Sequence, residues 1–91
     1  MLESPKIPPG SIGAVFAGRD GNVSVQRVII DSPAMRAGLA EGDAVLAIDG
    51  VAVKNSTEAR QRATGAPGTP VVLTVRRSLA QIPVGIVRAN Q

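Results

Sequence analysis

The stretch from Ser32 to Gly50 constrains the fold of this 91-residue chain more than any other part of its sequence. Ser32 is a residue type that caps helices, and Pro33 suits the first helical position, where a missing N–H loses no hydrogen bond. Gly38 is typical of a helix end. The sequence therefore predicts a helix of one to two turns that begins after Ser32 and ends at Gly38.

A short apolar run, Ala44 to Ile48, follows this helix. It lies between Gly42-Asp43 and Asp49-Gly50, and Asp-Gly is a typical tight-turn pair. Continuous apolar runs of this length are typical of strands that are covered on both faces. We therefore expect a buried strand, with Leu46 in the core and a tight turn at its end.

Two strand-like segments precede this unit. In Ser11 to Ala17 apolar side chains alternate between two faces, and Val23 to Ile30 is rich in β-branched residues. Asp20-Gly21 between them suits a turn with positive φ. The sequence predicts a hairpin, and the continuous apolar end of its second strand, Val28 to Ile30, indicates deep burial there.

A second helix is predicted from Ser56 to Thr64. Asn55 and Glu58 are spaced as in a capping arrangement, and Gly65 follows the helix at its end. Three alanines, which the helical repeat places on one face, are expected on the core side: Ala59, Ala63 and Ala66.

Two further strands are predicted to complete the chain, over Val71 to Arg77 and over Gln81 to Ala89. Pro83 lacks an N–H, and Gly85 lacks a side chain. Such residues are poorly suited to a central strand. We therefore expect the last strand at an edge of the sheet.

Composition excludes several kinds of catalytic or metal site. The chain has no Cys and no His, so it can hold no thiol nucleophile, no Ser-His-Asp triad and none of the usual zinc ligand sets. A Ser–Lys dyad would need Lys6 or Lys54, and neither is predicted in a place where burial would lower its pKa. We expect no catalytic residue, no metal and no cofactor.

Charge and hydropathy argue against two further partners. The net charge is +3, but the arginines are spread over several predicted elements, and Phe16 is the single aromatic residue. A nucleic-acid surface would need a basic stripe with stacking aromatics. No apolar run reaches the roughly 18 residues of a membrane-spanning helix. Neither nucleic acid nor a membrane span is expected.

Residues 32–50 read SPAMRAGLAEGDAVLAIDG, which closely resembles the signature of PDZ domains in the form found in bacterial proteases. The resemblance implies an α+β fold, with a curved antiparallel sheet or partial barrel of about five strands and two helices. Residues 11–91 would form this domain, and the Pro-rich residues 1–10 an extended arm or linker. The extra strand at the end of the chain resembles the permuted bacterial arrangement, in which the last strand replaces a missing first one.

The resemblance also implies a binding site. Ser11-Ile12-Gly13-Ala14 stands where PDZ domains carry their carboxylate-binding loop, with Ser11 in place of the first glycine and Ala14 in place of a large apolar residue. In the family the groove lies between the strand after this loop and the second helix. The implied peptide-binding residues are Ser11, Ile12, Gly13, Ala14, Val15, Phe16, Thr57, Gln61 and Thr64. In another helix register, Arg60 or Ala63 lines the groove instead.

By this resemblance the chain is expected to be a non-catalytic module that captures an extended protein C-terminus, or an unfolded segment, by β-strand addition. It would serve a bacterial protease of the HtrA, carboxyl-terminal-processing or site-2 type, as a monomer in the periplasm or cell envelope. The alternative is a docking domain that binds a folded partner without a free C-terminus. Small and polar groove walls favour weak binding with loose side-chain preference.

Overall fold

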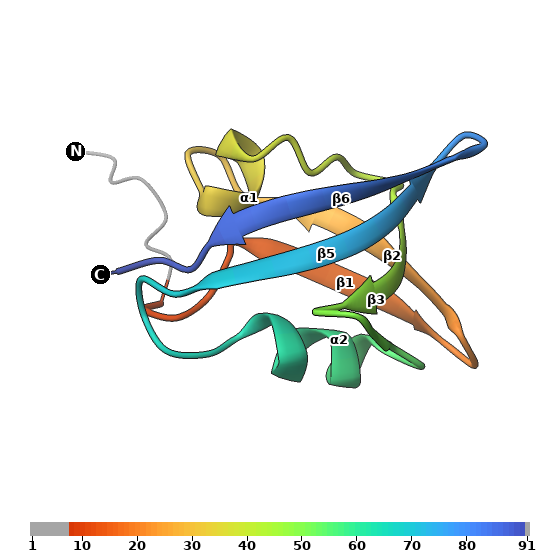
Figure 1. Ribbon diagram of the computed structural model, residues 1–91, viewed down its shortest axis with the longest axis horizontal. Helices are drawn as coiled ribbons and strands as arrows, with labels where there is room; N and C mark the ends of the chain where they lie inside the picture. The colour runs from red at the N-terminus through yellow and green to blue at the C-terminus, as the bar shows by residue number, and fades with distance from the viewer. Residues whose placement is uncertain (1–7, 91) are drawn as a thin grey trace.

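The computed structural model describes residues 8–90, which form six strands and two helices. All six strands belong to one antiparallel sheet in the order β1-β2-β3-β5-β6, with β4 paired to β3 outside this path. Figure 1 shows their arrangement. In chain order the elements are β1 (Ala14–Arg19), β2 (Asn22–Val28), α1 (Pro33–Arg36), β3 (Ala44–Ile48), β4 (Val51–Ala52), α2 (Ser56–Ala63), β5 (Pro70–Arg77) and β6 (Ala80–Val87).

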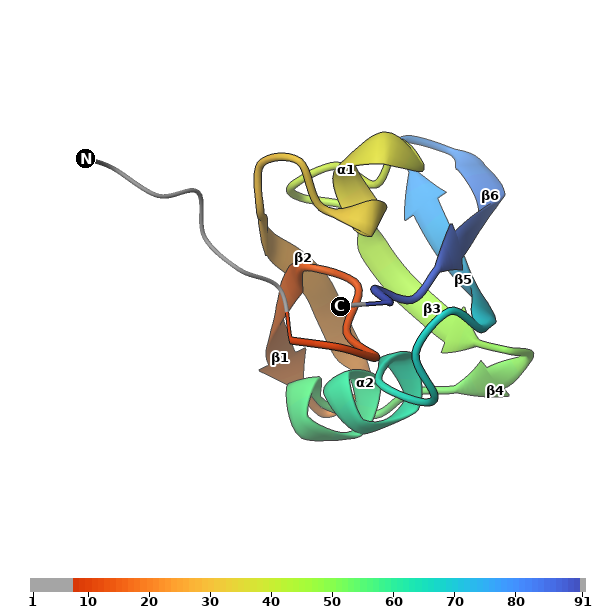
Figure 2. The same ribbon diagram turned by 90° about the vertical axis from the view of Figure 1, so that its left-hand side faces the viewer.

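The sheet is strongly curved. Seen from its end, β1 and β2 stand on one side and β5 and β6 on the other, and α1 and α2 lie above and below the space between them (Figure 2). The predicted α+β fold is confirmed. The sixth strand is the two-residue β4, which the tight turn after β3 folds back onto β3. Within residues 8–90, no helix is long and apolar enough to cross a membrane.

The local signals around α1 and β3 act as the sequence predicts. The N–H of Met35 donates to Oγ of Ser32 at 3.2 Å, and Pro33 occupies the first turn. Asp49 and Gly50 both have positive φ, at 51° and 80°, and they join β3 to β4 in a tight turn. Local side-chain chemistry therefore sets where these elements begin and end.

Helix α2 is capped at its start by the predicted pair. The N–H of Glu58 donates to Oδ1 of Asn55 at 2.8 Å, and Oε1 of Glu58 accepts from the N–H of Lys54 at 2.8 Å. Ala59 and Ala63 are buried as expected. The prediction for Ala66 is wrong, because the helix ends at Ala63 and Ala66 lies exposed in the turn that follows.

The prediction that β3 is buried throughout is wrong at Leu46, which is only half-buried. The pairing of β3 with β5 shifts between Val45 and Ala47, so Leu46 lies at a bulge. A bulge adds one residue to a strand and changes which side chains face the core. The buried residues of β3 are therefore Val45 and Ile48, three positions apart instead of two.

The expected deep burial at the end of the second strand is also wrong. Val23 and Val25 are core residues, whereas Val28 and Ile29 are half-buried and Ile30 is 68% exposed. The sheet pairing ends here, with the N–H of Ile29 donating to the Gly13 carbonyl at 2.8 Å. Beyond this bond the chain leaves the sheet and turns toward α1, so the residues after Val28 are no longer flanked by β1 and β3.

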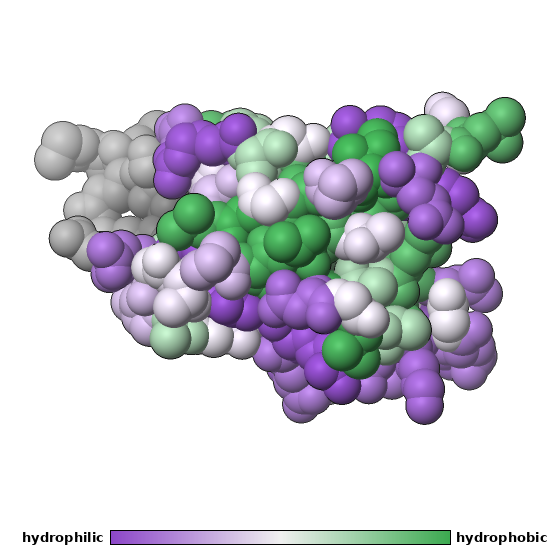
Figure 3. Space-filling model, in the orientation of Figure 1, coloured by the Kyte–Doolittle hydropathy of each residue, from purple (hydrophilic) through white to green (hydrophobic). Residues whose placement is uncertain are grey.

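Strand β6 lies at an edge of the sheet, as predicted, and pairs along its length with β5. Its inward side chains, Val84 and Ile86, are buried against the rest of the core. Figure 3 shows apolar residues mixed with neutral and polar ones over the face of this hairpin, whereas the surface over α2 is mostly hydrophilic. Leu79 at the hairpin tip is fully exposed.

One ion pair joins the loop before β3 to the end of β5. The carboxylate of Asp43 is buried and accepts from Nε and Nη2 of Arg77 at 2.9 and 2.6 Å, and from the N–H of Ala40 at 3.0 Å. Nη2 also donates to the Gly38 carbonyl at 3.0 Å. The hydrogen bonds from Arg77 hold the pKa of Asp43 below its ordinary value, although burial alone would raise it.

Asp43→Asn is expected to lower the free energy of unfolding at pH 7 by about 1.5 to 3 kcal/mol, the range for hydrogen bonds to charged groups. A lowered folded-state pKa stabilises the fold above the ordinary carboxyl pKa of about 3.9, and this contribution is lost as the pH falls through the folded-state value. The gap between wild type and variant should therefore close below about pH 4.

Urea unfolding at several pH values measures this gap. Glu41→Gln is the matched control, because it removes the same charge at an exposed neighbouring position. A loss of stability that stays constant from pH 7 to pH 3, or an equal loss in the control, would show that the ion pair is not its source.

Candidate functional site

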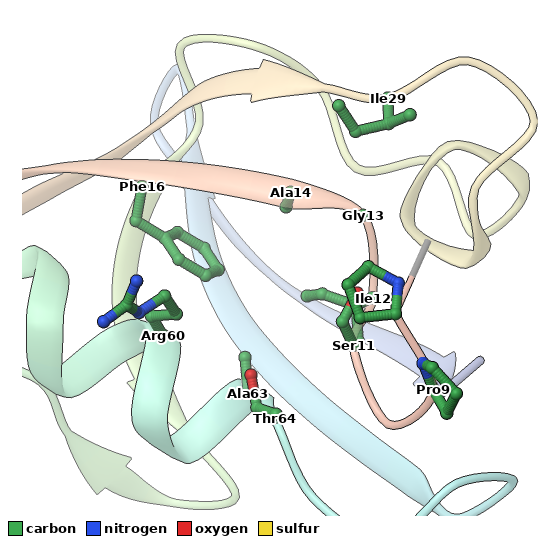
Figure 4. A pocket seen from close by; sticks show the side chains of 11 residues that line it. Pro9, Ser11, Ile12, Gly13, Ala14, Phe16, Ile29, Arg60, Ala63 and Thr64 are labelled. Atoms are coloured by element: carbon green, nitrogen blue, oxygen red, sulfur yellow. The ribbon is translucent and has the colours of Figure 1, made fainter. Parts of the chain in front are cut away.

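A groove runs between β1 and α2. It consists of a cavity of about 390 Å³ at the end nearer Gly13 and a second of about 320 Å³ toward Ser56. Ala14, Phe16 and Arg60 line both cavities, so the two are continuous (Figure 4). The first is also lined by Pro8, Pro9, Ser11, Ile12, Gly13, Ile29, Ala63 and Thr64, and the second by Val15, Ser56 and Thr57.

Eight of the nine predicted site residues line this groove: Ser11, Ile12, Gly13, Ala14, Val15, Phe16, Thr57 and Thr64. Gln61 does not. It is exposed and lines neither cavity, because it lies about 100° around the helix from Arg60. The spacing of three and four residues instead aligns Thr57, Arg60 and Thr64 along the groove. This is the alternative register, in which Arg60 and Ala63 are lining residues.

Strand β1 has an unpaired edge beside the groove, because it is the last strand on its side of the sheet. Gly13 pairs with Ile29 through the 2.8 Å bond to its carbonyl. Since backbone groups alternate in direction along an antiparallel pair, those of Ala14 and Phe16 point away from β2, toward the open edge. An extended chain placed here would meet an unused row of donors and acceptors.

The loop before β1 leaves two N–H groups without a backbone acceptor. The N–H groups of Gly10 and Ser11 donate to the carbonyls of Ala89 and Pro8, at 2.8 and 3.1 Å. Those of Ile12 and Gly13 have no backbone partner within residues 8–90. Gly13 has a φ of +80°, a conformation that turns neighbouring N–H groups into a concave, anion-binding arrangement.

The loop is held by the ends of two other segments. The carbonyl of Gly10 accepts from the N–H of Gly65, just after α2, and the carbonyl of Ser11 accepts from the N–H of Ala89, just after β6, at 3.0 and 2.8 Å. A Cβ at Gly10 would overlap the Gly65 carbonyl, and φ there is +85°. Gly10, which the sequence analysis assigned to the N-terminal arm, therefore contacts the domain directly.

Arg88 closes the same junction from the side of the C-terminal segment. Its Nε donates to the carbonyl of Ala63 at 2.9 Å and its Nη2 to that of Arg62 at 3.1 Å, so its guanidinium binds free carbonyls at the end of α2. The loop, the end of α2 and the segment after β6 thus form one hydrogen-bonded unit, which fixes the width of the groove.

Sequence reasoning missed four lining residues, which are Pro8, Pro9, Ile29 and Ser56. Nothing in a Pro-rich arm indicates contact with a groove, and the burial of Ile29 depends on where β2 ends. Gly13 lines the groove and is buried. Because its φ is also positive, Gly13→Val would strain the backbone with or without a ligand. This substitution therefore cannot separate binding from folding.

Comparison with known families identifies this arrangement. Residues 24–77, more than half of the chain, match the sequence profile of the PDZ domain. The chain belongs to the PDZ domain family. The match runs from within β2 to the end of β5. Strand β1 and the loop before it, which line the groove of this PDZ domain, lie outside the matched residues.

A curated relative of this PDZ domain is the carboxy-terminal-processing protease of Bartonella bacilliformis, which is 33% identical over 88 residues. That alignment covers 94% of this chain and 20% of the relative. The chain thus spans about a fifth of the length of the protease that it matches.

Solved structures share the fold. The PDZ domain of a carboxy-terminal protease from Vibrio cholerae, solved in complex with peptide, has a TM-score of 0.70 and 25% identity, with 89% of this chain and 94% of that chain covered. The HtrA3 PDZ domain, bound to a phage-derived ligand, has a TM-score of 0.73 and 24% identity, with 85% and 82% covered. The HtrA-type protease AlgW, solved with a decapeptide, has a TM-score of 0.78 and 21% identity, with 89% and 29% covered.

Proposed function

We propose that this PDZ domain captures the extended C-terminus of a protein, or of an unfolded segment, by adding it as a strand to the free edge of β1. The terminal carboxylate is received by the N–H groups of Ile12, Gly13 and Ala14. The observation that carries the proposal is the juxtaposition of an open strand edge, a groove and a loop with unused N–H groups.

The groove itself indicates how tightly such a segment is held. The cavity near the loop is lined mainly by apolar residues, among them Ile12, Phe16 and Ile29, so an apolar terminal side chain finds apolar surface but few specific polar partners. Main-chain hydrogen bonds and the carboxylate then supply most of the affinity, and the binding is weak. The proposed site residues are Ser11, Ile12, Gly13, Ala14, Val15, Phe16, Arg60, Ala63, Thr57 and Thr64.

The domain is proposed to serve as the substrate-recognition or regulatory part of a bacterial protease, in the periplasm or cell envelope. Support comes from the Bartonella bacilliformis relative and from the peptide complexes of the structural neighbours. The domain itself is proposed to be non-catalytic, since a chain without His or Cys lacks the common nucleophile and base pairs. It is also proposed to be a monomer.

A titration with three forms of one C-terminal peptide tests the proposal. The free acid is expected to bind at least about tenfold more tightly than the amide, because amidation removes the charged group that the loop N–H groups receive. N-methylation at a residue whose N–H faces β1 should abolish binding, whereas N-methylation at the next residue should not. Fluorescence polarisation or calorimetry measures each affinity.

The matched variants are Ala14→Glu and Ala52→Glu, which change the net charge equally. Ala14 lines both cavities, whereas Ala52 lies exposed on β4 and lines neither. Only the first should weaken acid-peptide binding, because it places a carboxylate beside the loop. If acid and amide bind equally, or if both variants behave alike, the capture of free C-termini is refuted in favour of docking to a partner without a free C-terminus.

A further inference from the structure

The sheet has two edges, and the proposed function uses one of them. The first edge is β1, and the second is β6, which stands on the opposite side of the molecule (Figure 2). Natural sheets protect an unused edge with charged residues, bulges, prolines or a covering element, because unpaired backbone groups recruit other chains. Strand β6 carries no charged residue and pairs with β5 without a bulge. Its protection therefore has to come from another feature.

The backbone of Pro83 faces the outside of the sheet. In the register of β5 and β6, Pro83 lies opposite Thr74 and Gly85 lies opposite Val72. Because proline has no N–H, its pair is one whose backbone groups point away from each other. The second pair agrees, since Val72 bonds to Asp49 on the other side of β5. Its N–H donates to Oδ1 of Asp49 at 2.9 Å, and its carbonyl accepts from the N–H of Asp49 at 2.7 Å. Gly85 therefore faces outward as well.

The free edge of β6 thus consists of every second residue, which are Gln81, Pro83, Gly85 and Val87. The next residue in this series, Ala89, is already engaged, since its N–H donates to the Ser11 carbonyl at 2.8 Å. No described residue bonds to the outward backbone groups of the four. Gly85 and Val87 line a hollow of about 430 Å³ between α1 and the end of β6, so α1 does not cover the edge there. Pro83 alone interrupts this row of donors.

The interruption matters for pairing between two copies of the chain. Two β6 strands that meet edge to edge about a two-fold axis run antiparallel. With the axis at Gly85, residue 83 of each copy faces Val87 of the other, and the proline ring stands where an N–H would donate to the Val87 carbonyl. Every register that engages more than Gly85 and Val87 meets Pro83 in a similar way. Pairing limited to those two residues is too short to hold two domains together.

We propose that Pro83 restricts strand addition to the β1 edge and prevents two copies of the domain from joining through β6. A domain that captures extended chains needs one open edge, whereas a second open edge would join copies into dimers or longer sheets. Pro83 is thus a specificity-determining residue that lies outside the groove. The inference goes beyond the proposed function and does not depend on it, because it concerns the other edge of the sheet.

Pro83→Thr tests the proposal, because it supplies the missing N–H and removes the ring. Pro83 is exposed and threonine suits a strand, so the variant should fold as the wild type does. Sedimentation velocity from about 10 μM to about 1 mM is expected to show a monomeric wild type and a variant that dimerises with rising concentration. The dimer association constant should rise at least about 30-fold, the equivalent of two net hydrogen bonds of about 1 kcal/mol each. Pro83→Ala adds the same N–H and should dimerise too.

Two further variants localise the effect. Pro67→Thr also replaces an exposed proline, but it lies in the turn between α2 and β5, adds no N–H to a sheet edge and should stay monomeric. Gly85→Pro in the Pro83→Thr background removes another outward N–H and should restore the monomer. The φ of Gly85 is not positive and a Cβ there would meet nothing within 4 Å, so the fold accommodates this substitution. In the Pro83→Thr dimer, hydrogen exchange at the N–H groups of Gly85 and Val87 should slow as the concentration rises.

Several outcomes would overturn the inference. If Pro83→Thr and Pro83→Ala stay monomeric at the highest concentration and keep the circular dichroism spectrum of the wild type, a feature other than Pro83 closes the edge. A wild-type dimer with slowed exchange at Gly85 and Val87 would refute it as well. So would a dimer that forms equally in Pro67→Thr or that persists with Gly85→Pro. The peptide titration decides the proposed function separately, since Pro83 lines neither cavity of the groove.

Discussion

Ending the chain after Arg77 is expected to abolish cooperative unfolding or to drive aggregation. The truncation removes β6, whose side chains Val84 and Ile86 are buried in the core. It also leaves the edge of β5 that pairs with β6 without a partner along its whole length, although β5 stays paired to β3, and this long edge would be exposed to other chains. The loss of Arg88 and Ala89 would further release the end of α2 and the loop before β1.

Urea denaturation followed by circular dichroism, with light scattering to detect aggregates, measures this outcome. The control is deletion of residues 1–8, which leaves all six strands of the described residues intact and should shift the melting temperature little. A chain that tolerates loss of its C-terminal strand but not of its N-terminal arm would have the unpermuted arrangement, with the arm as the first strand. The groove residues would then need to be reassigned.

Ile48→Ala is expected to lower the free energy of unfolding by about 2 to 5 kcal/mol, through lost apolar burial and the cavity left behind. Ile48 is 1% exposed and belongs to the core cluster. Such a loss is a large share of the stability of a domain, which is commonly about 5 to 15 kcal/mol. Chemical denaturation measures this loss, provided that the dependence of the unfolding free energy on denaturant concentration, the m-value, is the same for wild type and variant.

Leu46→Ala is the matched comparison on the same strand. Leu46 is half-buried at the bulge, so its truncation should cost only about 1 kcal/mol, in proportion to the smaller area removed from water. Equal losses for the two variants, or a larger loss for Leu46, would show that the bulge does not set the inward face of β3.

The features that could be predicted from the sequence are those that depend on neighbouring residues. The cap at Ser32, the turn at Asp49-Gly50 and the pair of Asn55 with Glu58 are local hydrogen-bond and φ preferences. Each acts over four residues or fewer, so its signal survives in the sequence. The motif over residues 32–50 is a series of such local signals, which is why it indicated the family from the sequence.

Tertiary contacts decided the rest. The bulge in β3, which turns Leu46 from the core, arises from its pairing with β5, a strand some 30 residues later in the chain. The same holds for Arg60, which lines the groove in place of Gln61 because α2 packs Ala59 and Ala63 inward against the sheet. Neither outcome can be read from local periodicity.

The loop that defines the site shows the difference most clearly. The sequence indicated an extended arm up to Gly10, and its resemblance to PDZ domains implied a carboxylate-binding loop after it. The structure joins Gly10 to Gly65 and Ala89 through backbone hydrogen bonds. Almost every residue carries the same backbone donor and acceptor groups, so only the folded chain decides which of them form hydrogen bonds. These bonds in turn set the width and the end of the groove.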